Sequence, residues 1–335
     1  MKEQVLTRYG KDPAVFRVRD AGEQRVGDNQ VRVRVGAFAL NPVDLKTQSG
    51  ESKMILPFAP PFVPGVDLAG TIDAVGKDVR RLQAGDRVFS CTGMDRMGAF
   101  SQSVVLDADR VTQAPSKASI VESAALPLPS LCALQAIEAG RLARGSRVLI
   151  HGGVGAVGSM AVQIAAHLGA EVAVTASGAD AERARSLGAI RVIDHRTQHF
   201  EDELRDLDFV FDTVGGDTLE RSWRVVKRGG TLVTLHVPPD ATALAKAGLK
   251  AGLLVKLVLP LATMAHRTAA AKVGAVFVPQ VTVPNARQLG EVAELVDAGV
   301  LRTTVERTFP FVEFTQALTY FASGRARGRV VVEAA

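Results

Sequence analysis

The stretch Arg147–Gly158, which reads RVLIHGGVGAVG, decides the fold. It begins with the apolar run Val148–Ile150, typical of a buried strand, and continues into a glycine-rich turn and a helix. Three of its glycines fit the spacing G-x-G-x-x-G. The first permits a tight turn, the second lets backbone N–H groups approach a pyrophosphate, and the third lets the helix pack closely on the strand. The loop therefore predicts a dinucleotide site made by Gly153, Val154, Gly155, Ala156, Val157 and Gly158.

The segments that follow support this reading over a purely structural glycine turn. An amphipathic helix over Ser159–Leu168 and an apolar strand over Glu171–Thr175 complete one βαβ unit. Apolar strands then alternate with helices, which predicts a parallel sheet covered on both faces. The predicted strands are Val148–Ile150, Val172–Thr175, Arg191–Asp194, Asp208–Asp212, Thr231–Leu235 and Ala275–Val278.

The first part of the chain has a different pattern. Gln30–Val35 alternates apolar and polar residues, and turn signals such as Asn41-Pro42 and Gly85-Asp86 recur at short spacing. These features predict a β-rich Greek-key barrel or sandwich. We place the final strand, Arg329–Val332, with this part, so that the parallel domain is inserted into the β-rich one. The predicted domains are residues 1–122 plus 284–335, and residues 123–283.

Composition restricts the partners. The net charge of +5 is spread along the 335 residues without a dense basic run, which argues against nucleic acid as a partner. Two cysteines give neither a disulfide framework nor a zinc motif. The most apolar stretch, Ala251–Met264, contains Lys256 and Pro260 and is too short to span a bilayer. No apolar leader precedes the first domain, so we expect a cytoplasmic protein without membrane attachment.

Several motifs together carry a family resemblance. These are ALNPVD at Ala39–Asp44, PGVDLAGTIDAV at Pro64–Val75, GDRV at Gly85–Val88, DFVFDTVGGD at Asp208–Asp217 and GRARGRVV at Gly324–Val331. With them, essentially the whole chain resembles the medium-chain dehydrogenase/reductase superfamily, and within it the zinc-independent quinone oxidoreductase branch, which includes zeta-crystallin-like and alkenal reductase-like proteins. The resemblance implies an α/β fold with a doubly wound Rossmann domain inserted into a GroES-like, partly open barrel.

The departures from the zinc-dependent members are informative. Those members carry a Cys where this chain has Asn41-Pro42, and His-Glu where it has Val66-Asp67. A catalytic zinc needs about three protein ligands from Cys, His or carboxylate side chains. We therefore expect no metal.

The cofactor implied by the resemblance is a nicotinamide dinucleotide. NAD-binding proteins end the second strand with Asp or Glu, whereas this strand runs into Thr175-Ala176-Ser177. The sequence therefore favours NADP(H) over NAD(H), with Arg183 left open between a phosphate contact and a solvated charge. The remaining cofactor-binding candidates are Cys132, Ser177, Arg183, His195, Arg196, Thr213, Val214, Gly215 and Arg329, the last matching a Lys that reaches a cofactor phosphate in relatives.

Three residues are catalytic candidates: Asn41, Asp44 and Lys46. The family reading places Asn41 near the nicotinamide and substrate. The alternative is an Asn-Pro turn in which Asp44 caps a short helix. Lys46 is open between a proton donor and a surface lysine.

These residues predict zinc-independent hydride transfer from NADPH to a small electrophilic acceptor, either a quinone or an α,β-unsaturated carbonyl. Two alternatives remain: an enoyl reductase acting on a carrier-bound or longer-chain substrate, and an NADPH-binding structural or regulatory protein with little turnover. We also expect a homodimer formed through the edge strand Ala275–Val278, because an unpaired sheet edge favours pairing with a second copy.

Overall fold

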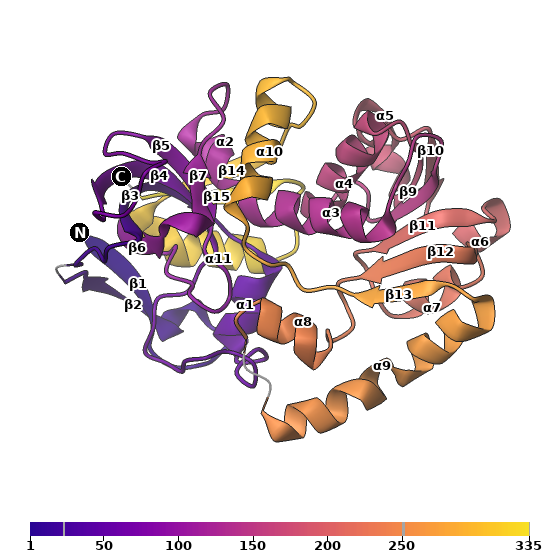
Figure 1. Cartoon of the computed structure of the whole chain (residues 1–335), viewed down its shortest axis with the longest axis horizontal. Helices are drawn as coiled ribbons and strands as arrows, with labels where there is room; N and C mark the ends of the chain where they lie inside the picture. Colours follow the sequence, from indigo (N-terminus) through magenta and orange to yellow (C-terminus); the bar gives the residue numbers. More distant parts are fainter. Residues whose placement is uncertain (23, 250–251, 335) are drawn as a thin grey trace. The chain divides into compact units, whose positions relative to one another are not determined.

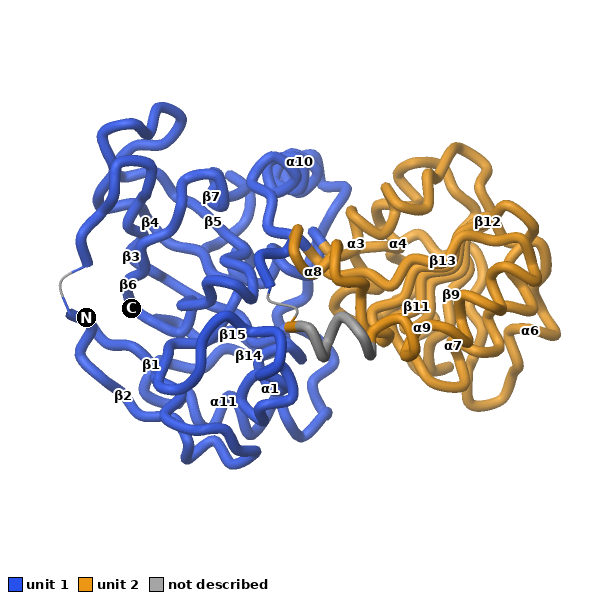
Figure 2. Tube along the Cα trace, turned by 60° about the horizontal axis from the view of Figure 1, so that its bottom comes forward, with its two compact units in different colours: residues 1–131, 247–250, 283–335 blue, residues 132–246, 251–282 orange. Residues whose placement is uncertain are grey.

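The computed structural model describes residues 1–22, 24–249 and 252–334, with the backbone alone for 253–258. The chain forms two compact units (Figure 2). Unit 1 contains residues 1–131, 247–250 and 283–335, and unit 2 contains residues 132–246 and 251–282. The first change of unit thus falls inside a helix, nine residues after the predicted boundary at 122.

Unit 1 is built on a seven-stranded sheet in the order β14-β15-β3-β4-β5-β7, with β6 also paired to β3, and on the separate antiparallel pair β1-β2. Strand β3 has the predicted alternation: Val31, Val33 and Val35 are buried, whereas Arg34 is exposed. The strands are β1 (Lys2–Leu6), β2 (Phe16–Asp20), β3 (Gln30–Ala39), β4 (Asp67–Val75), β5 (Arg87–Cys91), β6 (Ser103–Asp107), β7 (Val111–Gln113), β14 (Val305–Pro310) and β15 (Arg329–Glu333).

The closing strand belongs to this sheet, as predicted. β15 pairs in parallel with β14 and antiparallel with β3, where Val331 lies opposite Ala39. A buried aromatic cluster, in which the Phe16, Phe38 and Phe100 rings contact Phe314, joins the helix before β15 to the N-terminal strands. The helices are η1 (Pro13–Val15), α1 (Pro42–Ser49), η2 (Ala108–Arg110), α2 (Ile120–Ala124), α10 (Ala286–Asp297), η4 (Phe311–Glu313) and α11 (Phe314–Ala322).

Unit 2 is a six-stranded parallel sheet in the order β10-β9-β8-β11-β12-β13, and all six predicted strands are present. Figure 1 shows α4 and α5 on one face of the sheet and α7 and α9 on the other. The strands are β8 (Arg147–His151), β9 (Glu171–Ala176), β10 (Arg191–Asp194), β11 (Leu207–Asp212), β12 (Val226–Thr234) and β13 (Val276–Pro279). The helices are α3 (Pro127–Gly140), which begins in unit 1, α4 (Ala156–His167), η3 (Gly178–Asp180), α5 (Ala181–Ser186), α6 (Phe200–Glu203), α7 (Asp217–Ser222), α8 (Ala241–Lys246) and α9 (Leu253–Val273).

His151, the last residue of β8, is fully buried and connects three elements of unit 2. Its Nε2 lies 3.0 Å from Ser222 Oγ, and Ser222 donates its own proton to the Thr218 carbonyl. Nε2 therefore carries the ring proton, and Nδ1 accepts from Thr175 Oγ1 at 3.1 Å. Thr175 Oγ1 accepts in turn from the Gly152 N–H. A neutral imidazole thus fixes the residue that begins the glycine loop.

Burial lowers the pKa of His151 to about 4, because the charged imidazolium is desolvated. The unfolded chain binds this proton near pH 6.5 and the native protein does not. The stabilisation is therefore complete above pH 6.5 and is lost as the pH falls towards 4, by roughly 3 kcal/mol. In urea unfolding at pH 7 we expect His151→Asn to be less stable than the wild type, and the gap to narrow at pH 4.5. An equal stability difference between the two proteins at pH 7 and pH 4.5 would contradict the assignment of His151 as a neutral imidazole.

Candidate functional site

The glycine loop joins β8 to α4, and each glycine has a separate steric reason. A Cβ on Gly158 would lie 2.2 Å from the Gly152 carbonyl oxygen, and a Cβ on Gly153 would lie 2.6 Å from Val174. The sequence assigned the tight turn to Gly153, whereas the positive φ in this turn, +65°, is at Gly152. Gly153 is instead required for close packing on β9.

The first turn of α4 has the features of an anion site. Its N-cap residue is Gly155, which has no side chain to cap the helix, and no acidic residue lies in the first turn. The first N–H groups of a helix lack intrahelical acceptors and attract phosphate oxygens. The N–H groups of Ala156, Val157 and Gly158 are therefore suited to a pyrophosphate, which fits the predicted cofactor group.

The other predicted cofactor residues of unit 2 gather along the same edge of the sheet. Ser177 follows β9, His195 and Arg196 follow β10, and Thr213–Gly215 follow β11. β9 and β11 flank β8, so the strand order reverses beside the glycine loop, which is where open α/β sheets bind ligands. Thr213 donates to the His151 carbonyl, and the Val214 and Gly215 N–H groups donate to Asp212.

The structure adds a carboxylate near the second strand that the sequence argument did not consider. Ser177 Oγ donates a hydrogen bond to Asp180 Oδ2, so its proton is not directed at a ligand. His195 and Arg196 are exposed, whereas Arg183 in α5 is half-buried. The sequence did contain a sign of this carboxylate, because Asp180 lies only three residues after Ser177.

Cys132 lies buried in α3. Burial raises the pKa of its thiol to about 12, so the thiol stays protonated and is a poor nucleophile. Its carbonyl oxygen accepts from Gln280 Nε2 at 2.9 Å, just after β13.

In unit 1 a buried polar cluster forms around Asn41, Asp67 and Arg329. Arg329 Nη1 donates to Asn41 Oδ1 at 2.9 Å, and Arg329 Nη2 donates to Asp67 Oδ2 at 2.9 Å. Asn41 Nδ2 donates to Asp67 Oδ2 at 3.0 Å, and more weakly to the Ala39 carbonyl at 3.3 Å. Each of the three side chains is at most 4% exposed.

Asp44 stands beside this cluster. Its Oδ2 accepts from the Asn41 N–H at 2.7 Å, so Asp44 does close the first turn of α1 as the capping alternative foresaw. Its Oδ1 is buried and has no hydrogen-bond partner in the described part of the chain. Burial, reinforced by the charge of the Asp67 carboxylate, raises the pKa of Asp44 to about 8, so Asp44 is mostly neutral at pH 7.

Lys46 is not part of this group. It is exposed, whereas Asp44, Thr47 and Gln48 form the buried face of α1. Asp67 is the functional candidate that the sequence argument missed, having treated it only as a replaced metal ligand. Its signal was an acidic residue within the otherwise apolar run of PGVDLAG.

The Asp67 and Cys91 side chains are not suited to act as ligands of a catalytic zinc. Both Asp67 oxygens are engaged, since Oδ1 accepts from the Leu128 N–H at 2.7 Å and Oδ2 from Arg329 and Asn41. Burial also holds the pKa of the nearby Cys91 thiol well above its usual range. Within residues 1–22, 24–249 and 252–334, no three His, Cys, Asp or Glu side chains gather as possible metal ligands.

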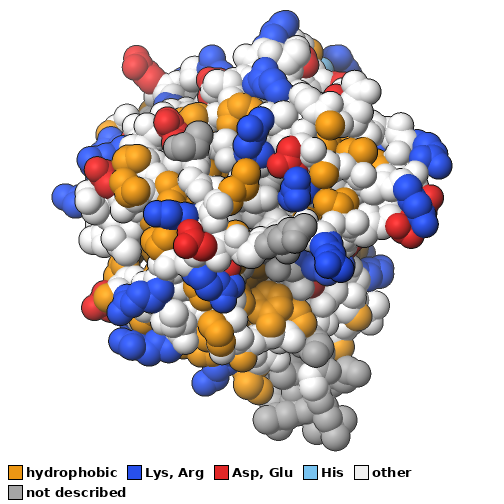
Figure 3. Space-filling view, turned by 90° about the vertical axis from the view of Figure 1, so that its left-hand side faces the viewer, with side chains coloured by type: hydrophobic (Ala, Val, Ile, Leu, Met, Phe, Trp, Pro, Cys, Tyr) orange, Lys and Arg blue, Asp and Glu red, His pale blue; other side chains and the backbone are white. Residues whose placement is uncertain are grey.

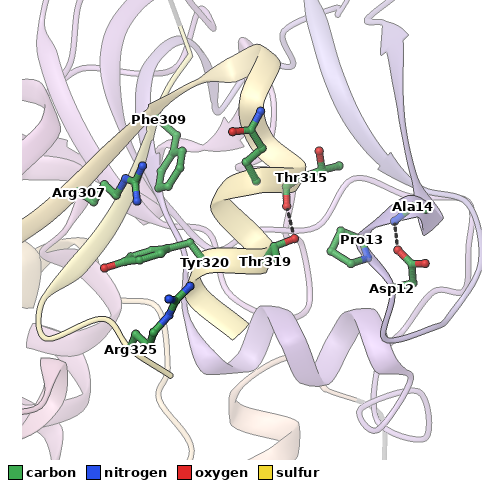
Figure 4. Close-up of a pocket in the computed structure, with 10 residues that line it drawn as sticks. Asp12, Pro13, Ala14, Arg307, Phe309, Thr315, Thr319, Tyr320 and Arg325 are labelled. Carbon is green, nitrogen blue, oxygen red and sulfur yellow. Dashed lines mark hydrogen bonds between the residues drawn. The ribbon is translucent and has the colours of Figure 1, made fainter. Parts of the chain in front are cut away.

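A surface pocket of unit 1 lies on α11 and β14, apart from the predicted residues (Figure 4). The Arg307 guanidinium stacks on Phe309 and Tyr320, at 4.6 and 4.9 Å from the ring centroids, and Arg325 lies 5.9 Å from Tyr320. On the face drawn in Figure 3, basic side chains are interspersed with acidic and hydrophobic ones. No helix among the described residues is long and apolar enough to cross a membrane.

Comparison with known proteins identifies the family. Residues 27–116 match the alcohol dehydrogenase GroES-like domain, and residues 187–332 match the zinc-binding dehydrogenase family. The mitochondrial NAD(P)H oxidoreductase RTN4IP1 of Mus musculus is 32% identical over 99% of this chain and 89% of its own length. The 2-methylene-furan-3-one reductase of Solanum lycopersicum is 29% identical over 99% of this chain and 79% of its own length.

A solved structure agrees with these matches. The quinone oxidoreductase of Coxiella burnetii has a TM-score of 0.83 at 28% identity, with 99% of each chain covered. The predicted fold class is thereby confirmed. The chain belongs to the medium-chain dehydrogenase/reductase superfamily, among relatives that are oxidoreductases of the quinone and alkenal reductase type.

Proposed function

We propose that this protein is a zinc-independent oxidoreductase that uses NADPH to reduce a quinone or an α,β-unsaturated carbonyl compound. The observation that carries the proposal is the dinucleotide-type edge of unit 2, where the glycine loop and the residues after β9, β10 and β11 come together. The names of the relatives support the substrate class, since they include an NADPH-dependent alkenal/one oxidoreductase of Arabidopsis thaliana at 28% identity.

The residues of unit 2 would hold the cofactor. When bound, the reduced nicotinamide supplies a hydride to the acceptor. The N–H groups of Ala156–Gly158 would bind the pyrophosphate, and Thr213–Gly215 lie one strand away, after β11. β9 ends at Ala176 without an acid, and Arg196 supplies positive charge after β10, which favours a 2′-phosphate. Asp180 works against this preference, although its carboxylate is occupied by Ser177.

In unit 1 we assign proton donation to Asp44 rather than to Lys46. A carboxylic acid that is still protonated at pH 7 can release a proton to an enolate or quinone oxygen. Asp44 Oδ1 has no partner among the described residues, whereas Asn41 uses its amide within the protein and holds Asp44 through its N–H. The pairing of Asp67 with Arg329 supports chemistry without zinc.

The edge strand β13 supports a homodimer. Among the described strands, β13 is hydrogen-bonded to β12 alone, and Val276 is 52% exposed. An exposed strand edge is satisfied by pairing with a second copy about a twofold axis.

The activity is tested by measuring NADPH and NADH oxidation with a panel of quinones, enones and alkenals. We expect turnover with NADPH, and a kcat/KM at least about tenfold lower with NADH because a 2′-phosphate contact is lost. Arg196→Ala should reduce the preference for NADPH over NADH. The matched control is Arg191→Ala at the opposite end of β10, where Arg191 pairs with Glu203, and it should leave the preference unchanged. Tight NADPH binding without oxidation by any acceptor would refute the enzyme assignment in favour of the structural or regulatory alternative.

Replacing Asp44 separates its role from that of Lys46. We expect Asp44→Asn to lower kcat with an enone by about 100-fold, the low end for a lost general acid, while Lys46→Met stays within about twofold of wild type. Because Asp44 keeps its proton in the native state up to about pH 8, the contribution of Asp44 to wild-type stability falls as the pH rises from 4 to 8. The asparagine side chain does not ionise, so the variant should gain stability relative to wild type over that range. A rate loss in Lys46→Met alone would reverse the assignment.

Sedimentation velocity at about 10 μM tests the dimer. The wild type should sediment as a dimer, and Val276→Lys should shift it towards monomer, because a charge on an edge strand opposes pairing. A wild-type monomer at this concentration would exclude the dimer.

A further inference from the structure

Arg329 opens the closing strand β15, and its guanidinium is buried inside unit 1. The side chain is 4% exposed, and both terminal nitrogens are engaged within the unit, one with Asn41 and one with Asp67. The family resemblance implies that a residue at this position contacts a cofactor phosphate. Both Nη nitrogens instead have partners inside unit 1, while the buried Nε has none among the described residues.

Asp67 is the central acceptor of the hydrogen bonds in this cluster. It is fully buried at the start of β4, and its two oxygens accept hydrogen bonds from the α1 turn, from β15 and from the first turn of α3. An isolated buried carboxylate or guanidinium is strongly unfavourable, so each of these two groups requires the other. The neighbouring titratable groups are Asp44 and Cys91, and burial raises the pKa of both, so they stay neutral at pH 7.

The forked shape of the guanidinium is essential to this arrangement. Two parallel N–H groups reach two acceptors on different elements, Asn41 Oδ1 on the α1 turn and Asp67 Oδ2 on β4. An ammonium group is a single point charge and does not reproduce both directions. The position of Asn41 in turn fixes Asp44, because the Asn41 backbone N–H donates a hydrogen bond to Asp44 Oδ2 at 2.7 Å.

We propose that Arg329 is a positioning residue, an internal cation that fixes Asn41 and Asp67 and thereby holds Asp44 in place, and that it is not a contact to the cofactor phosphate. This inference rests on the proposed function only in that Asp44 donates the proton.

The first test is NADPH binding, measured by fluorescence titration of the full chain. Arg329→Met should keep the Kd within about twofold of wild type, while kcat falls at least about tenfold with KM for NADPH unchanged. Arg329→Lys should recover part of kcat. The matched control, Arg325→Met, makes the same substitution at an exposed position on the preceding segment and should change neither quantity. An increase of Kd by tenfold or more in Arg329→Met would show a phosphate contact and overturn the proposal.

The second test does not require turnover, so it decides the inference even if no acceptor is reduced. In urea unfolding, Asp67→Asn and Arg329→Met should each lower the midpoint, and the double variant should recover at least half of the summed loss. Additive losses would overturn the pairing. Should Arg329→Met fail to fold, the double variant and Arg329→Lys supply both the binding and the unfolding measurements. Only a folded double variant would then support the proposal, and an unfolded one would contradict it.

Discussion

The ion pair between Arg329 and Asp67 is the constraint on which unit 1 depends. It joins residues 262 positions apart in the sequence, at 2.9 Å, in a region that excludes water. A buried ion pair gives little net stability by itself, but removing one partner leaves an uncompensated charge and is strongly destabilising. The pair therefore acts mainly through geometry: the start of β4, the turn before α1 and the start of β15 have to meet in one arrangement.

The two units prepare their sites by different physical means. Unit 2 uses backbone groups, since glycines clear space around the loop and no side chain caps the first N–H groups of α4, while neutral His151 holds Gly152 through Thr175. Unit 1 uses a buried ion pair, which orients the Asn41 amide, and burial raises the pKa of the neighbouring Asp44 carboxyl.

The sequence predicted the fold well because the fold depends on local patterns. Apolar runs such as Val148–Ile150 marked all six parallel strands, and the alternation in Gln30–Val35 marked the central strand of unit 1. The site was harder to predict from the sequence, because its contacts join residues that are far apart along the chain. Arg329 looked like a ligand-binding cation, and only the register between β15 and β3 places it beside Asn41. Similarly, the turn at Gly178–Asp180 brings a carboxylate back to Ser177, which the end of the strand alone did not reveal.

The place of β15 in its sheet has a consequence for synthesis of the chain. β15 lies between β14 and β3, so the central part of the unit 1 sheet is completed by a strand that is synthesised after all the other described strands. Unit 2 has its residues well before that point, since its last strand ends at Pro279. Until Arg329 emerges, Asp67 has no cation to pair with and Phe38 lacks the Phe314 ring that covers it. All residues of unit 2 are therefore synthesised before unit 1 receives the strand and the aromatic ring that complete its core.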